Sequence, residues 1–431
     1  MGFLGVSMLS LLAIGAPVGL ALMGAAVLVM VYDPMMNPSS VLRAFFGFTN
    51  GYTLLAIPFF IYAGFLMEKT GLISKLFDFA DSILGWLPGG FAYATLMAAV
   101  LFGAISGSST AMAAAMGVIA YPEMIRRGYP QWMAAGVIAC GGGIALLIPP
   151  SLTLILFGVL TETDIIRLFF AGVVPGLMLA ISDAIIIVGV AWFLKMPAGK
   201  FEPRRVVTSA WHAIPALMMP VIILGGLYTG WFTPTEAGAA SCAYAFLYGI
   251  TRDLVKRKPE FLKQLLPVTQ RAVNLTAIVF FLVGCVGVFQ FLLANKGWPQ
   301  DMAAWIGTFG LSSMSFMVVL LIALLFLSMF LNGVAMLVLT VPIIYPISLT
   351  LGIDPIHLGI LFALAVEMGG VIPPVGLNLF AVSGTTGVPL VQVMKGSVPF
   401  LITDGVVLIL VLLFPILALW LPELAVESHF R

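Results

Sequence analysis

The sequence predicts an all-α polytopic membrane protein with two inverted repeats, each containing a re-entrant helical hairpin and a broken helix. Hydrophobic residues make up 61% of the 431 positions and charged residues only 9%, so the surplus apolar surface must face lipid. Apolar runs follow one another along the chain, enough for roughly ten to twelve membrane segments of about 20 residues. Glycines and prolines of the first half recur in register in the second.

Basic residues gather in three clusters that predict the orientation. These are Arg126–Arg127; Lys195, Lys200, Arg204 and Arg205; and Arg252, Lys256, Arg257, Lys258 and Lys263. Because cytoplasmic loops collect Lys and Arg, we expect all three clusters inside, with two crossings between successive clusters. The net charge of +1 gives no indication of a nucleic-acid partner. We expect the chain to be surrounded by the lipid bilayer.

Two segments of the first hundred residues have distinct predictions. Residues 3–32 are apolar with no basic leader or small-residue cleavage pattern, so we expect one retained helix. Residues 70–88 are amphipathic and predict a helix along the membrane interface. The three cysteines, Cys140, Cys242 and Cys285, lie in apolar segments without disulfide or metal spacing, which indicates small buried side chains.

The internal repeat organises the rest of the chain. Pro149 aligns with Pro373 at an offset of 373 − 149 = 224, and the same offset pairs Gly172 with Gly396. Five predicted crossings separate the starts of the two copies, and an odd number makes the copies inverted. Inverted repeats are typical of alternating-access transporters, with a site near the midplane where the copies meet. The predicted units are an N-terminal helix and loop of the scaffold (1–52), a first repeat (53–195), a connecting scaffold segment with two helices (196–266), a second repeat (267–421) and a tail (422–431).

Each repeat is expected to contain two interruptions. In the hairpin predicted at 91–125, a Gly-Ser tip separates two apolar flanks too short to span a membrane; its counterpart at 313–347 has Asn332–Gly333 at its tip. Pro-Pro pairs interrupt the apolar segments 132–160 and 356–384 and predict an unwound stretch in each. Such backbone is tolerated at membrane depth only where protein or a water-filled cavity surrounds it.

These interruptions predict the chemistry of the site. Freed carbonyls and Ser, Thr and Asn oxygens suit a small alkali cation, whereas half-helix N-termini suit a carboxylate. We therefore expect a cation site in each repeat and an anion site between them. The predicted substrate-binding residues are Ser108, Ser109, Thr110, Ser151, Thr153, Asn332, Pro374 and Asn378.

Four carboxylates lie within apolar segments, where ionisable residues are functional candidates. Glu367 precedes the second unwound stretch and either faces the site or is a paired structural carboxylate. Glu236 follows Pro234 and is interpreted as a helix-start carboxylate. Asp183 and Asp404 lie at similar depth in equivalent helices, which favours matched structural roles.

The motifs together resemble the large membrane (M) subunit of TRAP (tripartite ATP-independent periplasmic) transporters, within the wider ion-transporter superfamily. The motifs are GAPVG (15–19), GAISGSSTA (103–111), IPPS (148–151), TPTEAG (233–238), LNGVAM (331–336) and IPPV (372–375). The resemblance covers essentially the whole chain. It implies sodium-coupled uptake of a small organic acid, such as a sialic acid or C4-dicarboxylate, across the bacterial inner membrane by an elevator motion.

The resemblance also implies partners and ligands. A separate small four-helix membrane subunit and a periplasmic substrate-binding protein would complete the system. About two Na⁺ sites, one per repeat, are expected. Their ligands would be Ser106, Gly107, Ser108, Gly143 and Pro149 in the first repeat, and Asn332, Gly333, Gly369, Gly370 and Pro373 in the second.

Three alternatives remain at this point. One is a proton-coupled or binding-protein-independent organic anion symporter of the same superfamily. A second is an intramembrane enzyme with a hairpin serine as nucleophile, but the tip lacks G-x-S-x-G and no histidine lies at its depth. A third is a channel, since inverted repeats with re-entrant hairpins also build pores.

Overall fold

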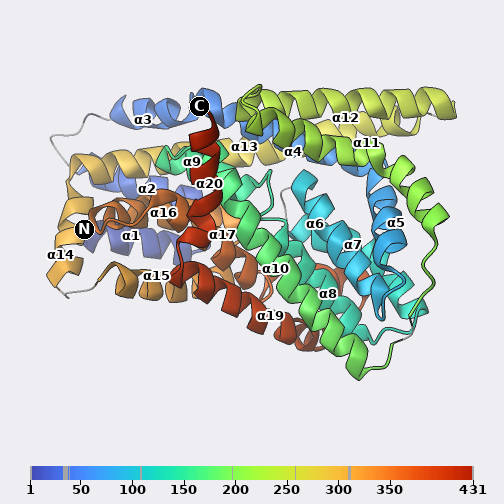
Figure 1. Cartoon of the computed structure of the whole chain (residues 1–431). Helices are drawn as coiled ribbons and strands as arrows, with labels where there is room; N and C mark the ends of the chain where they lie inside the picture. The colour runs from blue at the N-terminus through green and yellow to red at the C-terminus, as the bar shows by residue number, and fades with distance from the viewer. Residues whose placement is uncertain are drawn as a thin grey trace.

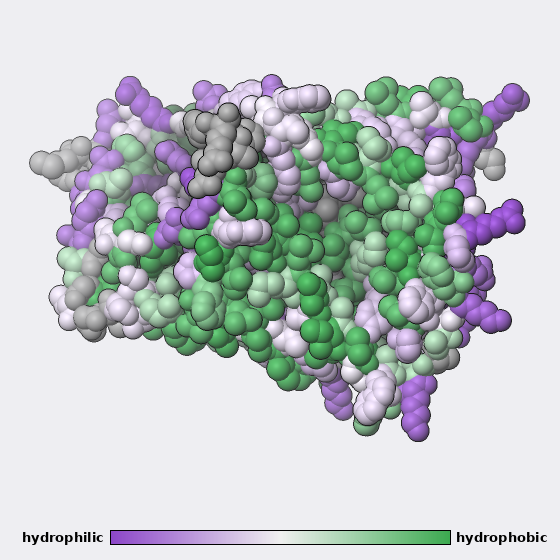
Figure 2. All heavy atoms as spheres, in the orientation of Figure 1, coloured by the Kyte–Doolittle hydropathy of each residue, from purple (hydrophilic) through white to green (hydrophobic). Residues whose placement is uncertain are grey.

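The computed structural model describes residues 2–32, 37, 39–106, 109–196, 198–257, 259–308 and 312–429. Every regular element among these residues is helical, and six helices are long and apolar enough to cross a membrane. Eight further apolar helices have only 10–17 residues, as interrupted segments require. Figure 2 shows hydrophobic residues across the middle of one face and hydrophilic residues toward its edges. The chain is an all-α polytopic membrane protein.

The N-terminal segment differs from its prediction. Two helices, α1 (Gly2–Ala13) and α2 (Val18–Val31), replace the single helix expected over 3–32 and pack against each other. The chain turns at Gly15, whose φ of +84° suits glycine, and Pro17 precedes the new helix. A third helix, α3 (Ser39–Thr49), follows. The unit 1–52 therefore holds three helices rather than one.

One group of helices, here called the scaffold, runs along one side of the molecule (Figure 1). They are α4 (Ala56–Lys69), α11 (Pro203–Tyr228), α12 (Pro234–Lys256) and α13 (Glu260–Asn295), with the short 3₁₀ helix η1 (Tyr52–Leu55) before α4. α12 packs along α4, and α13 packs against α2, α3 and α4. The boundary predicted at residue 267 falls inside α13, because the apolar run begins within a helix that already started at Glu260.

The remaining helices follow the same order in both halves. The first half contains α5 (Leu72–Leu84), the pair α6 (Gly90–Ser106) and α7 (Ser109–Arg126), the pair α8 (Gln131–Ile144) and α9 (Leu152–Thr161), and α10 (Ile165–Phe193). The second contains α14 (Trp298–Thr308), the pair α15 (Ser313–Ser328) and α16 (Gly333–Thr350), the pair α17 (Pro355–Gly369) and α18 (Leu377–Thr386), α19 (Leu390–Leu413) and α20 (Ile416–His429). Helices therefore begin and end close to the interruptions read from the sequence.

The two halves interlock through their broken helices. α8 packs along α19, and α18 packs against α7 and α8. At the closest crossing, a Cβ on Gly136 would lie 2.2 Å from the Gly396 carbonyl oxygen, so only glycine fits. In Figure 1, α8 and α19 lie on the side of the molecule opposite α11 and α12.

The basic clusters lie together at one end of the molecule. Asp81 accepts hydrogen bonds from Arg127 at 3.0 Å and Arg205 at 2.6 Å, which joins two clusters. Arg252 of the third donates to the Lys69 carbonyl at 3.3 Å, just before α5 begins. This common end agrees with the positive-inside interpretation.

Candidate functional site

Four helix N-termini meet at one cavity of about 280 Å³, here called the site cavity. They belong to α7 and α9 from the first half and to α16 and α18 from the second. The lining residues from these first turns are Ser109, Thr110, Leu152, Thr153, Gly333, Val334, Ala335, Leu377 and Asn378. Because the first N–H groups of a helix have no intrahelical acceptor and the dipole is positive there, a meeting of helix starts is an arrangement suited to an anion.

Local sequence explains where two of these helices begin. Ser151 caps α9 by accepting from the Leu154 N–H at 3.3 Å, and its hydroxyl donates to the Leu146 carbonyl. Asn332 caps α16 by accepting from the Ala335 N–H at 2.9 Å. Each cap uses one orphan N–H and holds the helix start in place.

Predicted site residues divide into three groups. The first group lines the site cavity: Ser109, Thr110, Thr153, Asn332, Gly333, Gly370 and Asn378. The second lies close by without lining it: Gly143, Pro149, Ser151, Gly369, Pro373 and Pro374. The third group consists of Ser106, Gly107 and Ser108. Gly107 and Ser108 lie outside the described residues, and Ser106 is described in its backbone only. Residues from both halves are thus brought together.

Asn378 lies at the centre of the contact between the halves. Its side chain is fully buried, and Nδ2 donates to the Ala139 carbonyl of α8 at 3.3 Å. A Cβ on Gly142 would lie 3.2 Å from that Nδ2 and 2.9 Å from the Ser109 carbonyl. The side chain oxygen Oδ1 is buried and has no hydrogen-bond partner among the described residues. A buried amide oxygen without a donor calls for a partner such as a bound ion or an ordered water.

One wall of the site cavity was not predicted. It consists of four apolar side chains on successive turns of α13, namely Leu275, Ile278, Val279 and Leu282. In the sequence these residues look like any lipid-facing stretch, so no local signal marks them. Only their approach to the starts of α9 and α16 shows that the scaffold closes the site.

Of the carboxylates in apolar segments, Glu236 lies at a helix start, whereas Asp183 and Asp404 are buried inside helices. Glu236 forms a capping box with Thr233 at the start of α12, which confirms the helix-start interpretation. Asp183 of α10 and Asp404 of α19 are both buried. Asp183 Oδ1 and both carboxyl oxygens of Asp404 have no hydrogen-bond partner among the described residues.

Glu367 does not line the site cavity. Its side chain is 1% exposed, and neither carboxyl oxygen has a hydrogen-bond partner among the described residues. It lies against Gly143, where a Cβ would come 2.1 Å from Glu367 Oε1. The glycine therefore provides the space that the carboxyl group fills, directly behind both unwound stretches.

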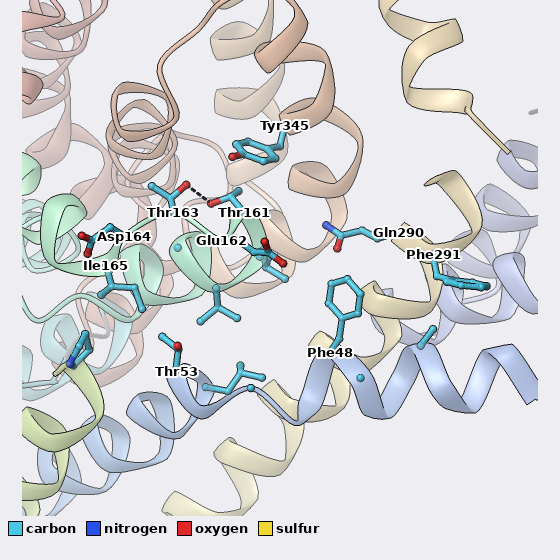
Figure 3. Close-up of a pocket in the computed structure, with 18 of the residues that line it drawn as sticks. Phe48, Thr53, Thr161, Glu162, Thr163, Asp164, Ile165, Gln290, Phe291 and Tyr345 are labelled. Carbon is cyan, nitrogen blue, oxygen red and sulfur yellow. Dashed lines mark hydrogen bonds between the residues drawn. The ribbon is translucent and has the colours of Figure 1, made fainter. Parts of the chain in front are cut away.

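A larger cavity of about 1060 Å³, here called the distal cavity, lies at the other end of α9. Phe48, Glu162, Gln290 and Tyr345 reach it from α3, the α9–α10 turn, α13 and α16 (Figure 3). The hydroxyls of Thr161 and Thr163 hydrogen-bond at 2.8 Å on its wall. Pro234, at the opposite end of α12 from the basic cluster, also lines it, so this cavity lies at the end expected to face outside.

Both cavities lie on one seam between α13 and the pair α9 and α16. Ile278 of α13 and Gly333 of α16 line the site cavity, whereas Gln290 and Tyr345 line the distal cavity. The step from Ile278 to Gln290 along α13 is twelve residues, and so is the step from Gly333 to Tyr345 along α16. At 1.5 Å per residue, each step is about 18 Å. The seam thus connects the site cavity with the distal cavity.

Comparison with known proteins agrees with this arrangement. The family described as "Tripartite ATP-independent periplasmic transporter, DctM component" matches residues 5–417. The C4-dicarboxylate TRAP transporter large permease protein DctM of Pseudomonas aeruginosa is 39% identical over 404 residues, covering 93% of each chain. The sialic acid TRAP transporter large permease protein SiaM of Vibrio cholerae is 34% identical, covering 96% of this chain and 97% of its own.

The fold is also found in a solved structure. The Alcanivorax borkumensis YdaH transporter superposes with a TM-score of 0.64 at 12% identity, covering 92% of this chain and 96% of its own. The chain is a transport protein and not an enzyme, and it belongs to the DctM family, the large permease component of tripartite ATP-independent periplasmic transporters.

Proposed function

We propose that this permease carries a small organic acid, of the C4-dicarboxylate or sialic acid kind, inward together with sodium. The observation that supports this most is the meeting of four helix N-termini, two from each half, at the site cavity. No Lys or Arg is among the described residues that line this cavity. A carboxylate would therefore be held by backbone N–H groups and hydroxyls together with co-bound cations.

Asn378, which the sequence predicts as a substrate-binding residue, and the neighbouring glycines also fit a sodium ion. Asn378 offers a buried, unpartnered amide oxygen, and the turn at Gly369–Gly370 ends α17 beside it. Amide and carbonyl oxygens are hard neutral ligands, which suit an alkali cation and avoid a fixed negative charge in the membrane. A bound cation would supply the positive charge that the cavity lacks. Asn332–Gly333 and the first hairpin tip would complete one site in each half.

The elevator motion is part of the proposal. The scaffold presents Leu275, Ile278, Val279 and Leu282 to the site, all apolar, so sliding along α13 would break no hydrogen bond of these side chains. The distal cavity lies along the same seam, in the direction that the site would travel. We propose that the two halves are inverted repeats whose hairpins and broken helices move as one body.

The name of the family supports the proposed partners. A tripartite system requires two further components, which we take to be a small four-helix membrane subunit and a periplasmic substrate-binding protein. A periplasmic partner supports a location in the bacterial inner membrane, with the basic clusters in the cytoplasm. The distal cavity would then face the delivering protein.

Reconstitution tests the proposal. Proteoliposomes containing both membrane subunits receive the binding protein outside, loaded with radiolabelled succinate or sialic acid. We expect accumulation that requires an inward sodium gradient and disappears when choline replaces sodium. Equal uptake without sodium would refute the coupling.

A proton-coupled symporter is the second candidate, because Glu367 is buried without a partner among the described residues. In the same vesicles an inward proton gradient replaces the sodium gradient. Accumulation driven by protons in sodium-free buffer would favour this alternative, and single-channel currents without substrate would favour a channel.

A further inference from the structure

One buried carboxylate at the cytoplasmic end binds arginines from two different parts of the fold. Asp81 is 3% exposed and lies on α5. Arg127 donates from Nη1 to Asp81 Oδ1 at 3.0 Å and from Nη2 to Oδ2 at 3.2 Å. Arg205 donates to Asp81 Oδ2 at 2.6 Å. We call these three side chains the Asp81 clamp.

The arginines of the clamp come from opposite sides of the proposed motion. Arg127 directly follows α7, the second helix of the first hairpin, whereas Arg205 lies in the first turn of the scaffold helix α11. α5 itself packs against both α6 and α11. A shift of the hairpin relative to the scaffold cannot preserve both arginine contacts of Asp81.

The two contacts are not equally strong. Arg127 makes a bidentate pair with Asp81, binds Glu123 at 2.8 Å, and stacks its guanidinium 4.0 Å from the Phe91 ring centre. Arg205 forms one ion pair among the described residues, that with Asp81, and its side chain is 49% exposed. Water can replace the carboxylate at an exposed arginine with little loss. The Arg205 contact is therefore the one that opens.

A second contact reports on the same interface. The hydroxyls of Ser82 on α5 and Ser209 on α11 lie 2.6 Å apart, next to the clamp. If α5 moves with the hairpin, this pair separates together with Asp81 and Arg205.

We propose that Asp81 is a positioning residue for transport: it fastens α5 and the first hairpin to α11 in this conformation, and the Asp81–Arg205 pair opens in each transport cycle. This inference rests on the proposed elevator motion. It adds the interface that separates and the residue that holds it.

A disulfide across the interface provides the first test. In the variant Ser82→Cys/Ser209→Cys, the short separation suits a disulfide after a small adjustment. We expect oxidation to reduce succinate or sialic acid uptake at least tenfold, and dithiothreitol to restore it. Ser82→Cys and Ser209→Cys alone, given the same oxidant, control for the native cysteines. Full uptake by the cross-linked protein would overturn the proposal.

The rate of disulfide formation provides a second test that needs no transport. We expect Arg205→Gln, in the double-cysteine protein, to slow cross-linking at least threefold because α5 leaves α11 more often. Glu123→Gln is the matched control, since its ion pairs with Arg126 and Arg127 stay within neighbouring residues of the chain and do not reach α11. Equal rates in all three proteins would show that no clamp exists, whether or not uptake depends on sodium.

Discussion

The two halves have the same order of helices but different side chains at equivalent places. Gly143 and Glu367 are related by the repeat offset, 367 − 143 = 224, and they also face each other across the core. The half with glycine provides the space, and the half with glutamate fills it with a buried carboxyl group. The two halves therefore differ chemically where they touch.

The helix starts differ in the same way. Ser151 caps α9 with its side chain, whereas α18 begins at Gly376, which has a φ of +45° and no side chain to cap with. In the second half the polar side chain at this helix start is that of Asn378, two residues after Gly376, and it donates to the Ala139 carbonyl instead of capping the helix. We therefore expect the second half to be more important for cation binding and the first for the rigidity of the site.

The largest effect is expected from filling the space at Gly143. In Gly143→Ala the new Cβ would lie 2.1 Å from Glu367 Oε1, and overpacking of this kind costs about 1–3 kcal/mol. We expect uptake below a tenth of the parent value and a lower midpoint of thermal unfolding. Gly189→Ala in α10 is the control, because its Cβ would meet nothing within 4 Å. A parent-like Gly143→Ala protein would contradict the inequality of the halves.

Removing the Asn378 side chain should have the next largest effect. Asn378→Ala deletes the unpartnered Oδ1 and the hydrogen bond to Ala139. We expect the sodium concentration for half-maximal uptake to rise about tenfold, equivalent to about 1.4 kcal/mol. Asn295→Ala removes a similar side chain-to-backbone bond at an exposed helix end and should leave the sodium response unchanged. An unchanged response in both proteins would remove Asn378 from the proposed site.

Removing the two caps should separate rigidity from binding. Ser151→Ala and Asn332→Ala each lose an N-cap worth about 1 kcal/mol, measured by thermal unfolding. We expect only Asn332→Ala to weaken sodium-dependent uptake as well, since Asn332 lines the site cavity and Ser151 does not. Asn332→Ser keeps the cap and controls for its loss. If Ser151→Ala changes the sodium response as much, the two halves are more alike than we infer.

The smallest effect is expected outside both halves. Glu236→Gln weakens the capping box with Thr233 at the exposed start of α12. We expect a slightly lower unfolding midpoint than the parent and unchanged uptake. A marked loss of uptake would mean that this scaffold end takes part in transport.

Part of the site could be predicted because its causes are local. Pro149 and Pro373 disfavour helix in the stretches that follow Ile144 and Gly369, where α8 and α17 end, and Asn332 is a strong cap in any helix start. Pro374 and Ser151 were placed correctly at the interruptions but do not line the cavity. Local sequence identifies where a helix breaks, but it does not say which side of the break faces the ligand.

By itself the sequence determined that the chain is helical, spans a membrane and is interrupted in matching places, because hydropathy and helix breaking depend on neighbouring residues. Only the tertiary structure decided that α13 closes the site, that Gly143 makes room for Glu367, and that Asp81 joins arginines 46 and 124 positions away. These contacts join residues far apart in the chain, and their energies depend on burial and on distances that only the folded protein defines.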